Sequence, residues 1–148
     1  LNYFYINCKE EIRQGISHDF TQRYRITYNL RRTNAIMPEI IEHINHMVNM
    51  FRNAVAHNEI TYSKVINRGP NMRSIRNVLG QTGLPISSQP GVFELIVSLR
   101  LVLDKSEYAT MSDSIKKLLT DADNQFSTQV YEKILSCMHF PNNYEHWI

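Results

Sequence analysis

Residues 38–57, PEIIEHINHMVNMFRNAVAH, decide the fold that this sequence predicts. Their apolar side chains recur at steps of three and four residues, the spacing that aligns side chains along one face of an α-helix. This apolar face consists of Ile40, Ile41, Ile44, Met47, Val48, Phe51 and Val55. Pro38 suits the first turn of a helix, Glu39 suits its positive N-terminal end, and Asn58 suits its C-terminal cap. The stretch therefore predicts an amphipathic core helix that ends near His57.

The rest of the chain predicts an all-α fold. The 92–103 segment is strongly apolar and should lie centrally, and Trp147 should close the core. Residues 59–66 fit either a short β-branched piece or a short helix. Apolar periodicity and capping residues predict further helices at 3–14 (ended by Gly15), 17–29, 74–79, 92–103, 112–122 (opened by Ser112 or Asp113) and 127–138 (opened by Ser127).

Residues 67–91 interrupt this pattern because they are rich in glycine and proline. Such a composition does not support a long regular element, so we expect a long loop between the core helix and the central helix. The loop carries three arginines, Arg68, Arg73 and Arg76. Because long loops in compact domains are commonly functional, we expect these side chains to contact a substrate or a partner.

Positive charge is concentrated in the first half of the chain. Residues 1–76 contain 11 lysines and arginines against 6 acidic residues, whereas residues 77–148 contain 5 against 8, so the net charges are +5 and −3. The basic half offers an electrostatic footprint for a polyanion, with Tyr24 and Tyr28 as stacking surfaces. Its arginines are Arg13, Arg23, Arg25, Arg31, Arg32, Arg68, Arg73 and Arg76. For each of them the alternative is an ordinary solvated face.

The overall composition argues against several classes of protein. The 148 residues suffice for one domain, and no apolar run approaches the roughly 18 residues that span a bilayer, so we expect no membrane partner. There is no Gly-rich phosphate loop, Cys-x-x-Cys pair or Gly-x-Ser-x-Gly elbow, which argues against P-loop hydrolases, zinc ribbons and esterases. We expect no cofactor. Cys8 and Cys137 read as small buried thiols in a reducing cytosol, which predicts a cytoplasmic protein; a disulfide between them is the less favoured alternative.

The polar end of the 38–57 helix carries three side chains that can act on a phosphate without a metal. Arg52 supplies a permanent charge on a planar fork, and His57 is of the residue type that exchanges protons nearest neutral pH. Asn53 lies four residues before His57 and can hold it or a phosphate oxygen. The structural alternative for His57 is an imidazole that caps the last carbonyls of the helix. Tyr62 can orient His57, stack on a base or pack in a core.

A metal site is an alternative on the same helix. His43 and His46 lie three residues apart, beside Glu42 and Asn45, and can chelate a metal. No third ligand stands at a recognisable distance, so we expect no metal.

Two features of the sequence resemble the abortive-infection (Abi-like) family of the HEPN superfamily, a group of helical RNases and nucleotide-binding domains. Arg52, Asn53 and His57 are similar to its Arg-x4-6-His signature, in which a polar residue often follows the arginine. Residues 134–147, ILSCMHFPNNYEHW, look like the closing helix and Met-Gly-Phe-Pro-x-Asn-Trp tail of Abi-like proteins. Here His139 replaces the usual glycine, and Tyr144 replaces the usual tryptophan.

The resemblance covers residues 37–148, because residues 99–108 also resemble the Leu-x-x-Leu-Leu helix of the family and its following loop. It implies a HEPN-type helical bundle with the Gly/Pro-rich loop between its motif helix and its central helix. Full-length Abi-like proteins are usually longer, and this chain opens on Leu1. Residues 1–148 are therefore expected to be one HEPN-like domain that fits the C-terminal part of a longer protein.

The function that the resemblance implies is a metal-independent endoribonuclease that cleaves single-stranded RNA in an abortive-infection, antiphage or toxin-like role. The catalytic residues would be Arg52, Asn53 and His57, and RNA would also contact Tyr62, Arg68, Arg73 and Arg76. HEPN ribonucleases are symmetric dimers whose motifs face each other, so a homodimer is implied, with an antitoxin or regulatory protein as a further partner. The alternative is a non-catalytic module with the same fold that binds RNA or a protein.

The helical period predicts where the three side chains point. Asn53 and His57 are about 40° apart around an ideal helix, whereas Arg52 and His57 are about 140° apart. Arg52 and His57 therefore cannot reach one phosphate from a regular helix. Either the helix loosens at Ala56 and His57, or a second copy of the chain completes the site.

Overall fold

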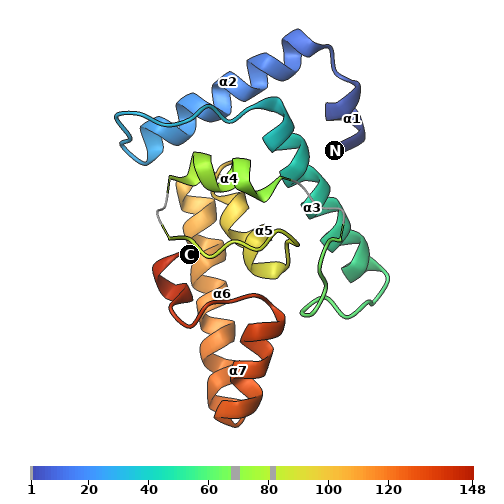
Figure 1. Ribbon diagram of the computed structural model, residues 1–148, viewed down its shortest axis with the longest axis vertical. Helices are drawn as coiled ribbons and strands as arrows, with labels where there is room; N and C mark the ends of the chain where they lie inside the picture. Colours follow the sequence, from blue (N-terminus) through green and yellow to red (C-terminus); the bar gives the residue numbers. More distant parts are fainter. Residues whose placement is uncertain (1, 68–70, 81–82) are drawn as a thin grey trace.

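The computed structural model describes residues 2–67, 71–80 and 83–148. These residues form helices and no β-strand, which confirms the predicted all-α class. Figure 1 shows α1, α2 and α3 towards one end of the molecule, α4 and α5 in the middle, and α6 and α7 as a hairpin that reaches the other end. None of the described helices is long and apolar enough to cross a membrane. The elements are α1 (Asn2–Asn7), α2 (Glu10–Thr27), α3 (Pro38–Ala56), α4 (Met72–Leu79), α5 (Val92–Leu99), α6 (Lys105–Gln125), α7 (Thr128–Cys137) and a 3-10 turn, η1 (Tyr144–His146).

The core helix is α3, which packs against α1, α2 and α5. Pro38 occupies its first turn, as predicted. Asn58 ends it with a left-handed φ of 55°, and the Glu59 N–H donates to the Ala54 carbonyl at 2.8 Å. Its buried apolar side chains are Ile40, Ile41, Ile44, Met47 and Phe51. Val48 and Val55, predicted on the same apolar face, are 38% and 64% exposed.

The prediction of one helix at 3–14 that ends at Gly15 is wrong. The chain breaks at Cys8 and Lys9, and α2 then continues through Gly15 to Thr27. A glycine inside a helix costs only about 1 kcal/mol relative to alanine, so anchoring by neighbouring residues offsets it. Ser17 provides such an anchor, since its buried hydroxyl donates to the Ile36 carbonyl.

The predicted start of a helix at Ser112 or Asp113 is also wrong, because α6 begins at Lys105. Its start is a capping box, in which the Asp104 N–H donates to the Glu107 carboxylate at 3.1 Å. Ser112 lies buried inside the helix instead. The predicted opening of α7 by Ser127 is confirmed.

The central helix, α5, is shorter than predicted because residues 100–103 form turns. Its Phe93, Ile96 and Val97 are buried, which confirms its central place. Residues 59–66 form neither a strand nor a helix. Trp147 is only 9% exposed and belongs to the core, as predicted.

The hydroxyl of Tyr108 on α6 is buried without a partner. Only 6% of the residue is exposed, and its Oη has no hydrogen-bond partner among the described residues. Burial raises the pKa of Tyr108 to about 12, although Arg100 opposes this rise. The folded pKa therefore exceeds the unfolded value of 10.0. The pKa difference does not affect stability below pH 10, but the folded state loses stability as the pH rises from 10 towards 12, because Tyr108 ionises first in the unfolded chain.

We expect Tyr108→Phe to be neutral or to raise the free energy of unfolding by up to about 1 kcal/mol at neutral pH, because it removes an unsatisfied hydroxyl. Above about pH 10 the variant should lose less stability than the wild type. Urea denaturation at neutral and alkaline pH measures both effects. Tyr131→Phe is the control, since it removes a hydroxyl that bonds Tyr144 at 3.3 Å. Equal destabilisation by the two substitutions would contradict the prediction.

Candidate functional site

Arg52, Asn53 and His57 are all exposed at the C-terminal end of α3. The helix is regular up to Ala56, and the His57 N–H still donates to the Asn53 carbonyl at 3.0 Å. It does not loosen at Ala56, so Arg52 and His57 point in directions about 140° apart. Within one chain, only Asn53 and His57 share a face.

The three side chains are free to meet a ligand. None of them forms a hydrogen bond or ion pair with another side chain in the part of the chain that the structure describes. His57 occupies the C-cap position through its backbone, but its imidazole does not bond the helix carbonyls there. The geometry therefore gives the imidazole no capping role.

A carboxylate lies close to His57. Lys64 donates to the Glu59 carboxylate at 2.6 Å, and this hydrogen bond lowers the pKa of Glu59, with a smaller contribution from the charge of His57. Glu59 is therefore ionised at neutral pH.

The predicted RNA-binding residues are placed differently from one another. Tyr62 is 49% exposed, which leaves its ring available and excludes a core position. Arg73 is exposed on α4, whereas Arg76 donates to the Ile86 carbonyl at 2.6 Å and holds the chain after α4. Arg68 lies outside the described residues.

The arginines of the basic half separate into two groups. Arg13 pairs with Glu42 at 3.1 Å, and Arg23 pairs with Asp104 at 3.1 Å, so both are neutralised locally. By contrast, the second group, Arg25, Arg31 and Arg32, lines a cavity of about 710 Å³ beside α2.

The expected stacking role of Tyr24 on α2 and of Tyr28 at its C-terminal cap is not supported by their surroundings. Tyr24 is only 5% exposed, and the guanidinium of Arg100 lies 4.4 Å from the centre of the Tyr28 ring. Tyr24 therefore cannot stack on a base in this structure, and Arg100 already occupies one face of Tyr28.

One polar cluster was not predicted. Glu94 on α5 is fully buried, and its carboxylate accepts the N–H groups of Ser87 at 2.9 Å and Gly91 at 2.8 Å. His139 Nδ1 lies 3.0 Å from the same carboxylate. The available signal was the glutamate three residues after Gly91, the position from which a side chain caps the start of its own helix. This cluster ties the C-terminal tail to the chain before α5.

His43 and His46, the candidate metal ligands on α3, do not belong to a metal-binding cluster of described residues. In the described ranges, no three His, Cys, Asp or Glu side chains come together as a metal would require. Burial lowers the pKa of His43, whose Nδ1 is buried and without a partner in that part of the chain. Cys8 and Cys137 are free thiols, and both are half-buried rather than fully buried.

Comparisons with models of protein families, with curated proteins and with solved structures found no match. The chemistry of the site must therefore be argued from the residues of this chain. The exposed end of α3 combines a permanent cation, a carboxamide and an imidazole.

Proposed function

We propose that this chain is a metal-independent endoribonuclease of the HEPN type, which cleaves single-stranded RNA in an abortive-infection or toxin-like role. The observation that carries the proposal is the exposure of Arg52, Asn53 and His57 together at the end of α3. Arginine supplies a permanent positive charge, and histidine is the residue type that exchanges protons nearest neutral pH. Together they can support phosphodiester cleavage without a metal.

In the proposed reaction the RNA supplies its own nucleophile. The 2′-hydroxyl oxygen attacks the adjacent phosphorus, and the bond from phosphorus to the 5′-oxygen of the next nucleotide breaks. His57 accepts the proton of the 2′-hydroxyl or donates one to the leaving oxygen. Arg52 stabilises the charge that gathers on the phosphorane, and Asn53 holds His57 or a phosphate oxygen. The products are a 2′,3′-cyclic phosphate and a 5′-hydroxyl.

The geometry of α3 supports a site shared by two copies of the chain. Because Arg52 and His57 diverge by about 140° on a regular helix, one chain cannot aim both at the same phosphate. A two-fold axis at this end of α3 would place the arginine of each chain opposite the histidine of its partner. Such an arrangement forms two equivalent sites, each with one arginine and one imidazole.

Exposed apolar side chains near this end of the helix support an interface there. Val55 is 64% exposed and Val48 is 38% exposed, and they lie seven residues apart, on nearly the same side of α3 as Arg52. Ile60, just beyond the helix, is 67% exposed. Apolar surface of this kind, rimmed by polar residues, is typical of protein interfaces.

The backbone at His139 is compatible with the family resemblance. His139 has a left-handed φ of 64°, a conformation that glycine adopts at least cost. Abi-like proteins usually have glycine at this position of the tail. The imidazole that replaces it is engaged by Glu94, which gives the departure from the family pattern a structural reason.

Wild-type protein should cleave single-stranded RNA in the presence of EDTA and leave 2′,3′-cyclic phosphate ends. Arg52→Ala and His57→Ala should each lower the cleavage rate by about 10²- to 10⁴-fold, because each removes one charge or proton transfer from the transition state. Gel electrophoresis of end-labelled RNA measures the rate, and end-group analysis identifies the products.

His18→Ala is the matched control, because it removes an exposed imidazole from α2 and should leave the rate unchanged. Cleavage that survives both site substitutions, or that stops when EDTA is added, would refute the mechanism.

A second candidate is a non-catalytic module that binds RNA. The observation in its favour is the divergence of Arg52 and His57 within one chain, together with a basic cavity elsewhere on the surface. This alternative predicts that RNA is bound and recovered intact at every protein concentration.

A further inference from the structure

A basic cavity lies at the far end of α3 from the proposed cleavage site. It is bounded by the second half of α2, the connection from α2 to α3, and the C-terminal end of α4, and its volume is about 710 Å³. Figure 1 shows that this connection leads into the N-terminal end of α3. Arg52 and His57 lie near the C-terminal end of the helix. The 19 residues of α3 separate the two places by about 28 Å.

The positive charge of the cavity is not compensated. Arg25, Arg31 and Arg32 line it, and no acidic residue is among the described residues that do. None of the three has a carboxylate within ion-pair distance in the described ranges, in contrast to Arg13 and Arg23. Arg25 donates its Nε to the Leu30 carbonyl at 3.3 Å, which leaves the outer nitrogens of its fork unused. Uncompensated guanidinium groups around a cavity favour an anionic ligand.

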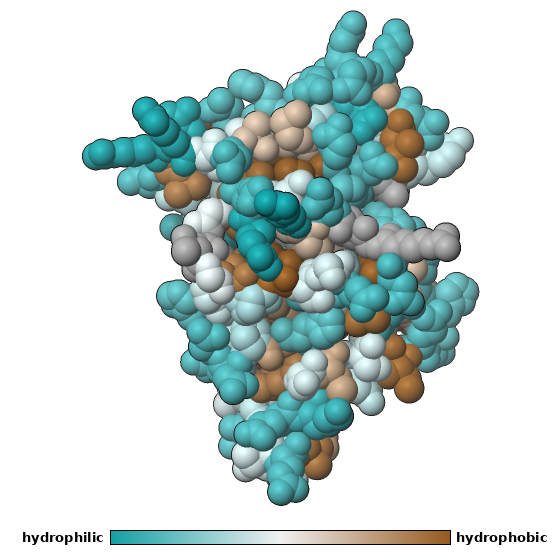
Figure 2. Space-filling model, in the orientation of Figure 1, coloured by the Kyte–Doolittle hydropathy of each residue, from teal (hydrophilic) through white to brown (hydrophobic). Residues whose placement is uncertain are grey.

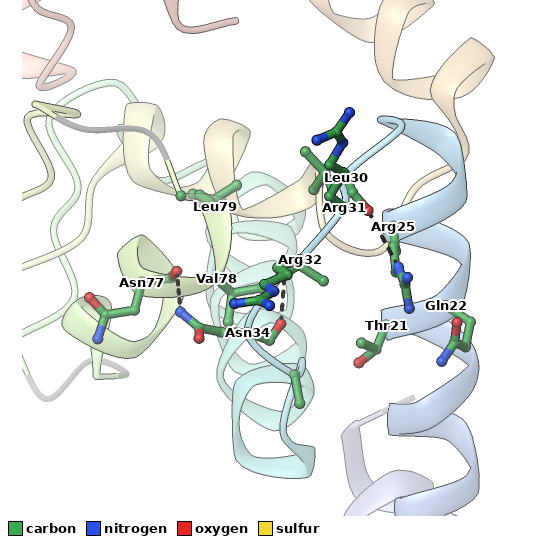
Figure 3. Close-up of a pocket in the computed structure, with 13 residues that line it drawn as sticks. Thr21, Gln22, Arg25, Leu30, Arg31, Arg32, Asn34, Asn77, Val78 and Leu79 are labelled. Carbon is green, nitrogen blue, oxygen red and sulfur yellow. Dashed lines mark hydrogen bonds between the residues drawn. The ribbon is translucent and has the colours of Figure 1, made fainter.

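The walls of the cavity are held in place by hydrogen bonds. Asn34 donates to the Asn77 carbonyl at 2.8 Å, which ties the connection to α4. The Ile36 N–H donates to the Thr21 hydroxyl at 2.9 Å, which ties the same connection to α2. Figure 3 shows Arg32 and Asn34 extending towards Asn77. These hydrogen bonds hold the backbone of the α2–α3 connection in place, which lowers the entropic cost of binding a ligand there.

The rest of the lining indicates that phosphate groups, not bases, are recognised. Leu30, Val78 and Leu79 give the cavity an aliphatic floor, and no aromatic ring is among its described lining residues. A base would find no aromatic ring to stack on, whereas guanidinium groups match phosphate oxygens in pairs.

The basic surface continues beyond the cavity. Arg73 is exposed one helical turn before Asn77, so it lies on the same face of α4 as the cavity wall. Figure 2 shows hydrophilic side chains gathered over the α2–α3 connection and over α4 on one face of the molecule. An extended ligand with repeated charges fits such a surface better than a single phosphate group does.

We propose that this cavity binds the backbone phosphates of a single-stranded RNA, away from the site of cleavage. The choice of RNA as the polyanion rests on the proposed function, but the binding itself does not require that the chain cut RNA. Arg31 and Arg32 hold phosphates in the cavity, and Arg73 contacts the strand where it leaves along α4.

The test is the salt dependence of binding to fluorescein-labelled oligouridylate, measured by fluorescence anisotropy in EDTA. All chains carry His57→Ala so that the RNA stays intact. Arg31→Gln with Arg32→Gln should weaken binding about tenfold at low salt and reduce the slope of log affinity against log salt by about 1.4, or 0.7 for each lost phosphate contact. Both arginines are exposed, so the fold should be unaffected.

The control is Lys117→Gln with Lys133→Gln, which removes the same charge from exposed positions on the α6–α7 hairpin and should leave the slope unchanged. Equal slopes in the two double variants, or no RNA binding at all, would overturn the proposal. So would ATP binding that depends on Arg31 and Arg32 while RNA binding does not, because the ligand would then be a free nucleotide.

The outcome is separable from that of the cleavage assay. If oligouridylate binds as expected and wild-type protein leaves it intact, the ribonuclease proposal fails and the cavity proposal stands. If wild-type protein cuts RNA and the arginine variant keeps the full salt slope, the cavity proposal fails alone.

Discussion

Mixing Arg52→Ala chains with His57→Ala chains should restore RNA cleavage, although each variant alone is inactive. If each site takes its arginine from one chain and its histidine from the other, a mixed dimer keeps one intact site and has one site that lacks both groups. Half of randomly paired dimers are mixed, so the activity should return to about a quarter of the wild-type value. The measurement is the cleavage rate after equimolar mixing, with the oligomeric state followed by light scattering.

The prediction follows from the regularity of α3. The His57 N–H keeps its helical bond to Asn53, so no local distortion turns Arg52 towards His57. Mixing two batches of Arg52→Ala is the control and should restore nothing. A monomer that cleaves RNA at the full rate, or a mixture that stays inactive while mixed dimers form, would exclude a shared site.

The helix that carries the candidate site was predictable because its signals are local. Apolar spacing, Pro38 at the start and Asn58 after the end all act within a few residues, and the structure agrees with the helix and with both of its ends. Val48 and Val55 are the exceptions, because they belong to the predicted apolar face and are exposed. The 140° divergence of Arg52 and His57 needed only the helical period. Their exposure could not be derived in that way, since it depends on which elements leave this side of α3 uncovered.

The failures arose where two local signals competed. Ser112 has a residue type that caps helices, but Asp104 and Glu107 form a reciprocal cap eight residues earlier, and the apolar pattern continues from there. Gly15 is of a residue type that often ends helices, but it has no left-handed φ and the helix passes through it. A residue type indicates a boundary only when its backbone conformation or hydrogen bonds require one.

The basic cavity was beyond prediction because its walls are distant in sequence. Arg25, Arg31 and Arg32 could be counted as positive charges, but only the fold brings them beside the end of α4. The same count included Arg13, which the fold pairs with Glu42 from another helix. Net charge therefore identified the basic half of the chain, and the three-dimensional arrangement determined which charges remain available.

Glu94→Ala should lower the free energy of unfolding by about 3–5 kcal/mol. The carboxylate is fully buried, and its removal leaves the N–H groups of Ser87 and Gly91 and the His139 ring without their partner. The His139 ring lies close to the Gly91 backbone, since a Cβ on Gly91 would lie only 3.0 Å from His139 Nδ1. Urea denaturation followed by circular dichroism measures the loss.

Glu107→Ala on α6 is the matched control for this effect. Glu107 holds the same third position of its helix and accepts the N–H of its own cap residue, Asp104, at 3.1 Å, but it is exposed. Its loss should cost about 1 kcal/mol or less, because water replaces the missing acceptor. Glu94→Gln should fall between the two, since its amide keeps one acceptor oxygen and loses the other. Equal losses for Glu94→Ala and Glu107→Ala would mean that the buried cluster adds nothing beyond an ordinary helix cap. The tail at His139 would then have to be held by its other contacts, such as the hydrogen bond from the Phe93 N–H to the Met138 carbonyl at 3.1 Å.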